Sequence, residues 1–474
     1  MERRSIVRRA VGAAIVLALS ASCVLNSPPD AVALKTEAMP KVSVPDGWTA
    51  GKAATGPVAA NWAASFNDAE LVAAITEAIA NNPDLASGAA RVETAMAYAR
   101  LAGAKLYPSV DLMGRAGGKL SGDNSGLQGA LLSISWELDL WGRVRYGRAA
   151  ATADAQSTEK DFVYARESIA AAVARNWFLA TEAGLQADVA RAAIQDSEAL
   201  VQLAETRARV GVGNDEDVYV ARATVGSYRD ALRQLELARE QAVRALELLM
   251  GRYPSAAAMP APRLPGQPAD VPAGLPSELL ERRPDVVAAE RRVAAAFNRV
   301  GEAKAARLPT IALTSGVSAI SSSLFLLKDH DNPVWNFGAN LLAPIYKGGA
   351  LKTQVEIRTA EQKQAVAAYA SVGLRAFGEV ENALASENAA REREQILNGA
   401  LADQQRAYDV VQNQFRVGST DMRFVTQRQL ALNATQSALV RVQAEQRVQR
   451  VNLYLALGGS YTVPPTPPSD TQKK

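Results

Sequence analysis

The amino-acid sequence predicts an α+β membrane protein built from two internal repeats, each with a strand hairpin followed by very long helices. Three observations predict this fold class. A set of short motifs occurs twice, four segments alternate apolar with polar residues, and two long stretches contain no proline. Alternation with a period of two indicates half-buried strands, whereas long alanine-rich stretches without proline favour helices.

The chain repeats its motifs at a nearly constant distance. Pro83 and Pro284 each precede an aspartate, and they lie 201 residues apart. Further along, the tripeptide RVG at 209–211 recurs at 416–418, which is an offset of 207. A period of about 200 residues is too long for a solenoid array. The sequence therefore contains two copies of a domain-sized unit.

Prolines mark where the first helix of each copy begins and ends. A Pro-Asp pair is expected to open a helix at Pro83 and again at Pro284, because proline suits the first helical position and aspartate complements the helix dipole. Asn82 can cap the first of these helices. Each helix should end before the next proline, Pro108 or Pro309, because the residue before proline disfavours the α region.

Four segments then alternate in the manner of strands, as Leu132 and Ile134 do against Ser133 and Ser135. The predicted strands are residues 109–120, 127–140, 309–320 and 334–345. Their length and alternation are typical of a transmembrane β-barrel, although a half-buried soluble sheet shows the same pattern. Four strands cannot close a barrel, and an open edge is not tolerated in lipid, so strands in a membrane would require a dimer, trimer or tetramer.

Two proline-free stretches, from about 143 to 209 and from about 348 to 416, predict helices much longer than a globular core needs. The second stretch carries small and apolar residues at coiled-coil spacing, in a seam of Val366, Ala370, Gly373, Phe377, Val380 and Leu384. A seam of small residues lets helices approach closely, as the wall of a tube would need, although a solid bundle is the commoner meaning.

Each long helix should end at a left-handed glycine, Gly211 in the first copy and Gly418 in the second. Asn214 or Thr420 can cap the helix that returns. The sequence therefore predicts two long antiparallel helical hairpins with tight tips, near 209–217 and near 416–424.

Composition excludes several classes of function. The formal net charge is +3, and residues 1–22 account for all of it, which leaves no basic field for nucleic acid. His330, in an expected strand turn, is the only histidine, so a catalytic dyad of two histidines is impossible. The sequence contains no phosphate loop, metal cluster or nucleophile elbow. We therefore expect neither an enzyme nor a bound cofactor.

Residues 1–22 have the form of a signal peptide, with a basic start and an apolar run too short to cross a bilayer. Cys23, the only cysteine, follows at once. This arrangement resembles a bacterial lipoprotein signal, although Ser20 stands where such signals usually carry leucine. We expect a covalent lipid on Cys23, with an incidental cysteine after an ordinary signal as the alternative. By the same resemblance, Val24 indicates the outer membrane.

The order of helix, strand hairpin, long helix, glycine tip and returning helix, given twice, resembles the TolC family of outer-membrane channels. The motifs that carry the resemblance extend over most of the chain, and they include RRPDVVAAERRVAAAFNRVGEAKAARLPTIALTSG at 282–316, WNFGANLLAPIYKGG at 335–349, FRVGSTD at 415–421 and VNLYLALGGSY at 451–461. The chain is most similar to the lipoprotein branch of that family, the OprM and NodT-like outer-membrane components of tripartite RND-type efflux systems.

The resemblance implies a homotrimer in which each chain gives four strands to a twelve-stranded transmembrane β-barrel and its helices to a long periplasmic α-helical barrel. It also implies an exit duct for small molecules such as drugs, with a role in antibiotic resistance, that works with a periplasmic adaptor and an inner-membrane transporter. The expected organisation is a signal peptide (1–22), a lipidated equatorial segment (23–80), a first repeat (81–251), a Pro-rich linker (252–277), a second repeat (278–460) and a tail (461–474).

The candidate functional residues lie at the two tips. The residues expected to form a periplasmic gate are Asp215, Glu216, Asp217, Arg416, Asp421 and Arg423. The residues expected to dock the adaptor are Arg209, Val210, Gly211, Arg416, Val417 and Gly418. In the gate hypothesis Arg416 pairs with an aspartate of a neighbouring hairpin; alternatively the acidic residues only complement helix dipoles.

Two other functions fit parts of the sequence. A type I protein-secretion channel would have the same fold and a different cargo. A periplasmic coiled-coil lipoprotein would account for the helices but not for four alternating strands.

Overall fold

The computed structural model describes residues 25–51, 61–115, 128–258, 260, 263–321 and 334–461. The expected signal peptide, Cys23, His330 and residues 462–474 of the expected tail lie outside the described residues. The chain divides into two compact units. Of the described residues, the first comprises those within 25–42, 90–161 and 285–372, and the second comprises those within 43–89, 162–284 and 373–461. Each sequence repeat contributes to both units.

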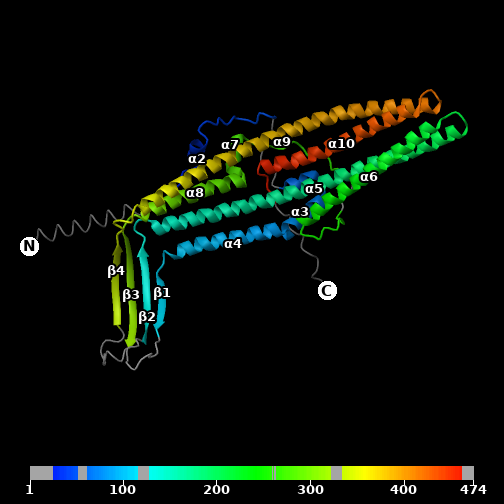
Figure 1. Cartoon of the computed structure of the whole chain (residues 1–474). Coiled ribbons are helices and arrows are strands. Elements are labelled where there is room, and N and C mark those ends of the chain that lie inside the picture. The colour runs from blue at the N-terminus through cyan, green and yellow to red at the C-terminus, as the bar shows by residue number, and fades with distance from the viewer. Residues whose placement is uncertain are drawn as a thin grey trace, which may run out of the picture. The chain divides into compact units, whose positions relative to one another are not determined.

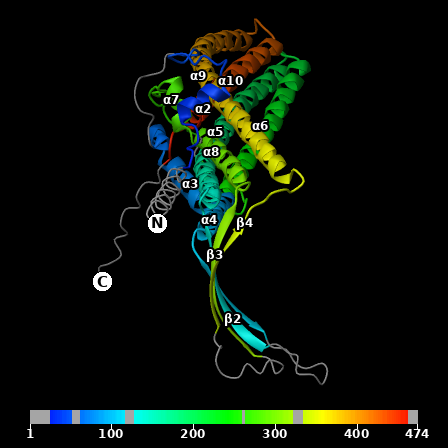
Figure 2. The same cartoon turned by 90° about the vertical axis from the view of Figure 1, so that its left-hand side faces the viewer.

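The first unit contains a four-stranded antiparallel sheet in the order β1-β2-β3-β4 (Figure 1). Its strands are β1 Ser109–Arg115, β2 Gln128–Leu138, β3 Thr310–Ser321 and β4 Val334–Leu342. Each overlaps one of the four predicted strands. The sheet twists strongly along its length (Figure 2), as the backbone sterics of L-residues favour.

Two strands end earlier than the sequence predicts. β2 ends at Leu138 rather than 140, because Asp139 turns to the next helix, where its carboxylate accepts a hydrogen bond from the backbone N–H of Val144 at 2.9 Å. β4 ends at Leu342 rather than 345, where Pro344 has no N–H for a strand ladder. The predicted segments 116–120 and 127 lie outside the described residues.

The sheet register reproduces the repeat. Ser109 pairs with Ser135 in the first hairpin, and Thr310 pairs with Leu342 in the second. Thr310 lies 201 residues after Ser109, and Leu342 lies 207 residues after Ser135. The repeat offset is therefore six residues larger for the second strand of each hairpin, and with these two offsets the paired residues of the two hairpins correspond one to one.

The helices that lead to and from this sheet in the first unit are most of α4 Pro83–Ala104, most of α8 Pro284–Ala305, and the first parts of α5 Arg143–Arg209 and α9 Ala350–Arg416. The unit also contains α2 Ala31–Ala38. α4 begins as predicted, because the Asn82 side chain accepts hydrogen bonds from the backbone N–H groups of Asp84 and Leu85 at 2.9 and 3.2 Å.

The second unit is helical. It contains the remaining parts of α5 and α9, the short 3₁₀ helix Trp62–Phe66, α3 Ala69–Asn81, α6 Asp215–Leu249, α7 Pro276–Arg282 and α10 Met422–Ala456. Its largest aromatic side chains pack together: the rings of Trp62 and Tyr454 stack at 5.9 Å, and those of Phe66 and Phe178 lie 5.1 Å apart. No helix among the described residues is both long and apolar enough to span a bilayer.

The predicted seam of α9 is partly wrong. Within the second unit the buried residues of α9 include Gly373, Ala376, Val380, Ala383, Glu387 and Ala390. Gly373, Val380 and Leu384 are buried as predicted, whereas Phe377 is only half-buried. The coiled-coil spacing places Phe377 in the seam, whereas the neighbouring Ala376 and Ala383 and the ion-paired Glu387 are buried.

Candidate functional site at the hairpin tips

The first tip joins α5 to α6 through a glycine turn. Gly211 has a φ of +77°, the left-handed conformation that the sequence predicts. The N–H of Val212 donates to the carbonyl of Arg207 at 3.0 Å, which closes the end of α5. Asn214 caps α6 as predicted, because its side chain accepts a hydrogen bond from the N–H of Asp217 at 2.8 Å.

The second tip repeats the glycine turn with a different cap. Gly418 has a φ of +84°, and the N–H of Ser419 donates to the carbonyl of Gln414 at 2.9 Å. The predicted cap Thr420 is wrong, because α10 begins at Met422 and its N-cap is Asp421. The carboxylate of Asp421 accepts from two N–H groups of the first turn, and its charge complements the helix dipole better than a hydroxyl does.

Two side chains join the tips by hydrogen bonds to the backbone. Asp217 at the start of α6 accepts a hydrogen bond from the backbone N–H of Met422 at the start of α10, at 3.2 Å. Arg207 donates to the carbonyls of Phe415 and Val212 at 3.0 and 3.2 Å, and its guanidinium lies over the Phe415 ring at 4.9 Å from the ring centre. Both side chains belong to the first hairpin, and each satisfies a backbone group of the second tip.

Sequence reasoning missed Arg207. A basic residue in the last turn of a helix is ordinarily a solvated complement to the dipole, so nothing in its sequence context distinguishes this arginine. Phe415 immediately precedes the second RVG motif, and Arg207 lies two residues before the first. Only the packing of the two hairpins brings them together.

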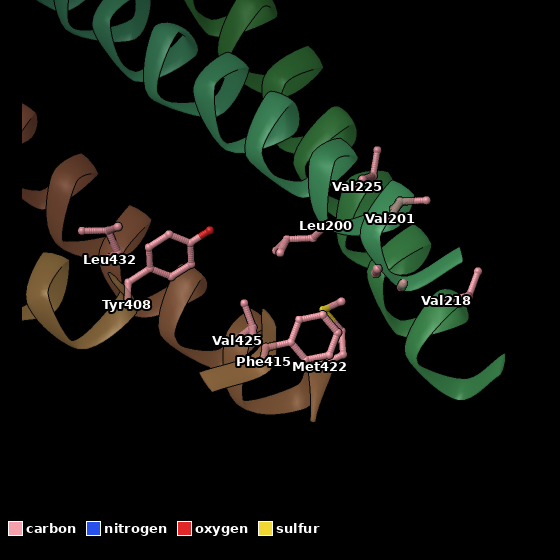
Figure 3. Close-up of a cluster of buried hydrophobic side chains, with 11 residues drawn as sticks. Leu200, Val201, Val218, Val225, Tyr408, Phe415, Met422, Val425 and Leu432 are labelled. Atoms are coloured by element: carbon pink, nitrogen blue, oxygen red, sulfur yellow. The ribbon is translucent and has the colours of Figure 1, made fainter. Parts of the chain in front are cut away.

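A buried apolar cluster lies behind the tips and spans both hairpins (Figure 3). Its members are Leu200, Val201, Ala204, Val218, Ala221, Val225, Tyr408, Phe415, Met422, Val425 and Leu432. Leu200 points across toward the second hairpin in Figure 3. Burial raises the pKa of Tyr408 to about 12, so its phenol stays neutral at physiological pH.

Polar pairs extend the contact between the hairpins beyond this cluster. The hydroxyl of Ser197 on α5 lies 3.1 Å from the Gln429 side-chain oxygen on α10, and both residues are buried. The side-chain amide of Asn433 on α10 donates to the Tyr228 hydroxyl on α6 at 2.9 Å. Because buried polar groups need partners, these pairs favour a single alignment of the two hairpins along their long axes.

The charged residues at the tips divide into caps and one ion-pair group. Arg423 lies 3.2 Å from Asp421 and 3.9 Å from Glu216, so it connects the two tips. Arg416 lies 3.5 Å from the side-chain oxygen of its neighbour Asn413. The predicted link between Arg416 and an aspartate concerns neighbouring hairpins of an assembly and stays a prediction.

The predicted docking residues are placed on the outside of the tips. Val210 and Val417 expose 65 and 80% of their surface, and Val212, which is not among the predicted residues, exposes 64%. Exposed apolar residues concentrated at a turn are typical of a protein contact rather than of a solvated loop.

A Pro-rich linker is fastened to the same unit by arginines. Arg447 donates to the carbonyl of Pro265 at 2.8 Å, and Arg239 donates to that of Pro260 at 2.8 Å. The fully buried Arg450 donates to the carbonyl of Pro268 at 3.1 Å and forms an ion pair with the buried Glu387. No group of His, Cys, Asp and Glu in the described chain could hold a metal ion.

The family model described as "Outer membrane efflux protein" matches residues 74–252 and 275–459, one segment in each repeat. The chain belongs to this family. It is 31% identical over 411 residues to the Cation efflux system protein CusC of Escherichia coli, which covers 85% of this chain and 88% of that protein. It is also 31% identical over 417 residues to the Pyoverdine export outer membrane protein OpmQ of Pseudomonas aeruginosa, at 84 and 87% coverage.

Solved structures of the same family share the fold. The crystal structure of CusC matches with a TM-score of 0.79 at 27% identity, over 88% of this chain and 97% of that chain. The outer-membrane channel OprN matches with a TM-score of 0.80 at 25% identity, over 89 and 99%. The TolC-like fold expected from the sequence is therefore confirmed, and the family is one of outer-membrane channels rather than enzymes.

Proposed function

We propose that this outer-membrane efflux channel is the exit duct of a tripartite pump, which passes small molecules such as drugs from the periplasm to the exterior. The observation that carries the proposal is the sheet, one face of which exposes large apolar side chains: Trp335, Phe337 and Leu341 are 75, 80 and 69% exposed. An apolar surface of this kind is costly in water and favourable in lipid. Family membership supports the same function.

The assembly we propose is a homotrimer. In the described chain, β1 pairs only with β2 and β4 pairs only with β3, so each carries one unpaired edge. Unpaired N–H and C=O groups are not tolerated in the hydrocarbon core. Three copies joined edge to edge would form a closed twelve-stranded barrel, which leaves no edge.

We also propose that a covalent lipid on Cys23 anchors the mature chain. The backbone N–H of Asn26 donates to the Tyr146 hydroxyl at 3.0 Å, close to the ends of the sheet strands. Nearby, the indole N–H of Trp141 donates to the carbonyl of Pro309 at 2.7 Å, immediately before β3. Aromatic residues next to strand ends are typical of the membrane interface. This placement of Asn26, three residues after Cys23, supports an anchor at that level.

The partners we propose are a periplasmic adaptor and an inner-membrane transporter of the RND type. The exposed tip residues Val210, Gly211, Val417 and Gly418 would contact the adaptor, with Arg209 and Arg416 beside them. A tip with apolar residues and a left-handed glycine offers a compact surface that six hairpins of a trimer would present together.

The proposal is tested by dye efflux in the native bacterium. Cells that lack the gene should accumulate a fluorescent efflux dye, and the wild-type gene should restore dye release. The purified protein should conduct ions in planar bilayers and should show a lipid mass on Cys23 by mass spectrometry. Equal accumulation with and without the gene for a panel of dyes, together with bilayers that stay closed, would overturn the function; an unmodified Cys23 would remove the anchor alone.

A further inference from the structure

Residues 25 and 26 are fastened to the chain where it enters α5, next to the sheet. The side chain of Leu25 lies against Gly142, since a Cβ added at that glycine would come within 2.6 Å of the Leu25 methyl carbon Cδ2. The backbone N–H of Asn26 donates to the Tyr146 hydroxyl at 3.0 Å. The Tyr146 ring in turn lies on Gly301 of α8, where an added Cβ would meet ring carbons at 2.6 Å. Two glycines therefore leave the room that Leu25 and Tyr146 occupy.

The second repeat keeps the glycine turn without this seat. Gly349 and Thr353 hold the places of Gly142 and Tyr146, at an offset of 207 residues. Gly142 and Gly349 both have a positive φ, of +76° and +83°, so the turn itself belongs to the repeat. Among the described residues, however, a Cβ added at Gly349 would meet nothing within 4 Å. The seat therefore serves the one N-terminal segment of the chain.

A cavity of about 270 Å³ lies beside Asn26, between the start of α5, the end of α8 and the first part of α9. Aromatic and aliphatic side chains line part of it, and groups that can donate hydrogen bonds line the rest. These residues are Tyr146, Phe297, Val300, Lys304, Leu308 and Gln362. Among the described residues that line the cavity, none is acidic. Such a lining favours a ligand that offers hydrogen-bond acceptors on a short apolar frame.

We infer that this cavity holds the glyceryl diester group of the lipid on Cys23. The inference rests on the proposed lipid anchor and assigns it a binding site on the protein. Cys23 lies outside the described residues, two positions before Leu25. Two residues span at most about 7 Å even in an extended chain. A group joined to the Cys23 sulfur therefore begins within reach of the cavity beside Asn26.

The chemistry of a glyceryl diester matches the lining. Its ester oxygens accept hydrogen bonds and donate none, and the Lys304 ammonium and the Gln362 amide supply donors. Phe297 and Leu308 offer apolar surface to the glyceryl carbons and to the first methylene groups. The cavity is too small for two complete acyl chains, so these continue into the bilayer. The anchor is then held at a fixed depth beside the end of the sheet.

Photocrosslinking in cells, followed by mass spectrometry of the digested protein, tests the inference. The photoreactive residue p-benzoylphenylalanine replaces Phe297, and in a second variant Leu308, so that one position serves if the other disturbs folding. The matched controls carry it at Met96 and Tyr107, which lie 201 residues earlier at the equivalent positions and do not line the cavity. Irradiation should join the peptide that contains position 297 or 308 to the lipid of the Cys23 peptide, several-fold more often than in the controls.

A charge reversal gives a second measurement on the same crosslink. Lys304→Glu should reduce the link from position 297 several-fold, because a carboxylate and an ester both present acceptors. The matched control is Arg307→Glu, which changes an exposed cation that does not line the cavity, and the link should persist in it. Equal yields in the two variants would contradict a contact between Lys304 and the lipid.

The mass of the linked product separates the outcomes. A free glycerophospholipid on position 297 or 308, in place of the Cys23 peptide, would overturn the inference in favour of a lipid from the bilayer. Links to the Cys23 peptide that are as frequent from Met96 and Tyr107 would overturn it as well. In both cases a lipid mass on Cys23 leaves the proposed anchor intact. An unmodified Cys23 would remove the anchor and this inference together, while dye efflux would still report on the channel.

Discussion

Glu247 is a buried carboxylate that fixes the start of the Pro-rich linker. It accepts hydrogen bonds from the backbone N–H groups of Ala256, Ala257 and Ala258 at 2.7, 2.8 and 3.1 Å, and from the Ser255 hydroxyl at 3.2 Å. Ala256 has a φ of +61°, which is unfavourable for a residue with a Cβ. The carboxylate therefore holds a turn that the local sequence would not adopt by itself.

The same residue gives a pH prediction. Burial alone would raise the pKa of Glu247, but the hydrogen bonds from Ala256, Ala258 and Ala257 outweigh it and lower the pKa below 4.5. A lowered acid pKa adds stability that is complete above 4.5 and is lost as the pH falls through the folded-state value. Glu247→Gln should cost about 2 kcal/mol at neutral pH and weaken the loss of stability in acid.

Thermal unfolding of the purified protein at pH 7 and below pH 4.5 measures this effect. Glu240→Gln is the matched control, because Glu240 lies on the same helix and forms a partly exposed ion pair with Arg244. That control should change stability by less than about 0.5 kcal/mol. Equal effects of the two substitutions would contradict the role of Glu247.

At the scale of single elements, the residues that cap or end helices made the helix boundaries predictable. Pro83, Asn82 and the glycines Gly211 and Gly418 act on their own backbone, so the sequence alone places these helix ends. Errors arose where two residues compete for one role. Asp421 replaced the expected cap Thr420, because a carboxylate next to the first helical residue outcompetes a more distant hydroxyl.

Contacts between distant elements could not be predicted in this way. The link of Arg207 with Phe415 and the clamp of Arg450 with Glu387 join residues 208 and 63 positions apart. Neither pair follows a periodic pattern, since long-range packing decides them. The sequence located the tips and the charged residues on them, and the structure added which of those residues contact one another within the chain.

The caps at the tips allow the charge-gate hypothesis to be tested against a purely structural role. Asp217 and Asp421 each accept backbone N–H groups of α10, a function that an asparagine side chain can retain without charge. If charge closes the gate, the double variants Asp217→Asn with Asp421→Asn and Asp217→Ala with Asp421→Ala should both raise single-channel conductance. If capping is what matters, only the alanine variant should do so, with a loss of about 1 kcal/mol per cap.

Single-channel recording in planar bilayers gives the conductance, and sensitivity of cells to large antibiotics gives a second reading. Unchanged conductance of both double variants would remove these aspartates from the gate. The tips would then keep only their proposed contact with the adaptor.

At the scale of the whole molecule, the exposed apolar face of the sheet is the feature expected to contact lipid. Leu132 lies on that face between Ala130 and Ile134, while Ser133 lies on the other face and directs its hydroxyl to the Asp111 carbonyl at 3.5 Å. The two neighbouring positions therefore meet different solvents in a membrane.

Leu132→Arg should cost about 2 to 4 kcal/mol of folding free energy if the position faces lipid near the midplane, because a guanidinium is expensive there. Ser133→Arg should cost much less, because that side of a closed barrel is wet. Unfolding of the reconstituted protein in denaturant measures both. Equal and small effects would contradict a lipid-facing position for Leu132.

The arginine clamps on the Pro-rich linker have a consequence for how this segment can change. Arg239, Arg447 and Arg450 donate hydrogen bonds to main-chain carbonyls of the linker. Asp270 is a linker side chain that also takes part, at 3.8 Å from Arg450. Every amino acid supplies a backbone carbonyl. The path of the linker therefore depends mainly on the arginines of the helices that hold it. Many residues of the linker can therefore be replaced, in evolution or when a label is inserted, while its backbone keeps the same path.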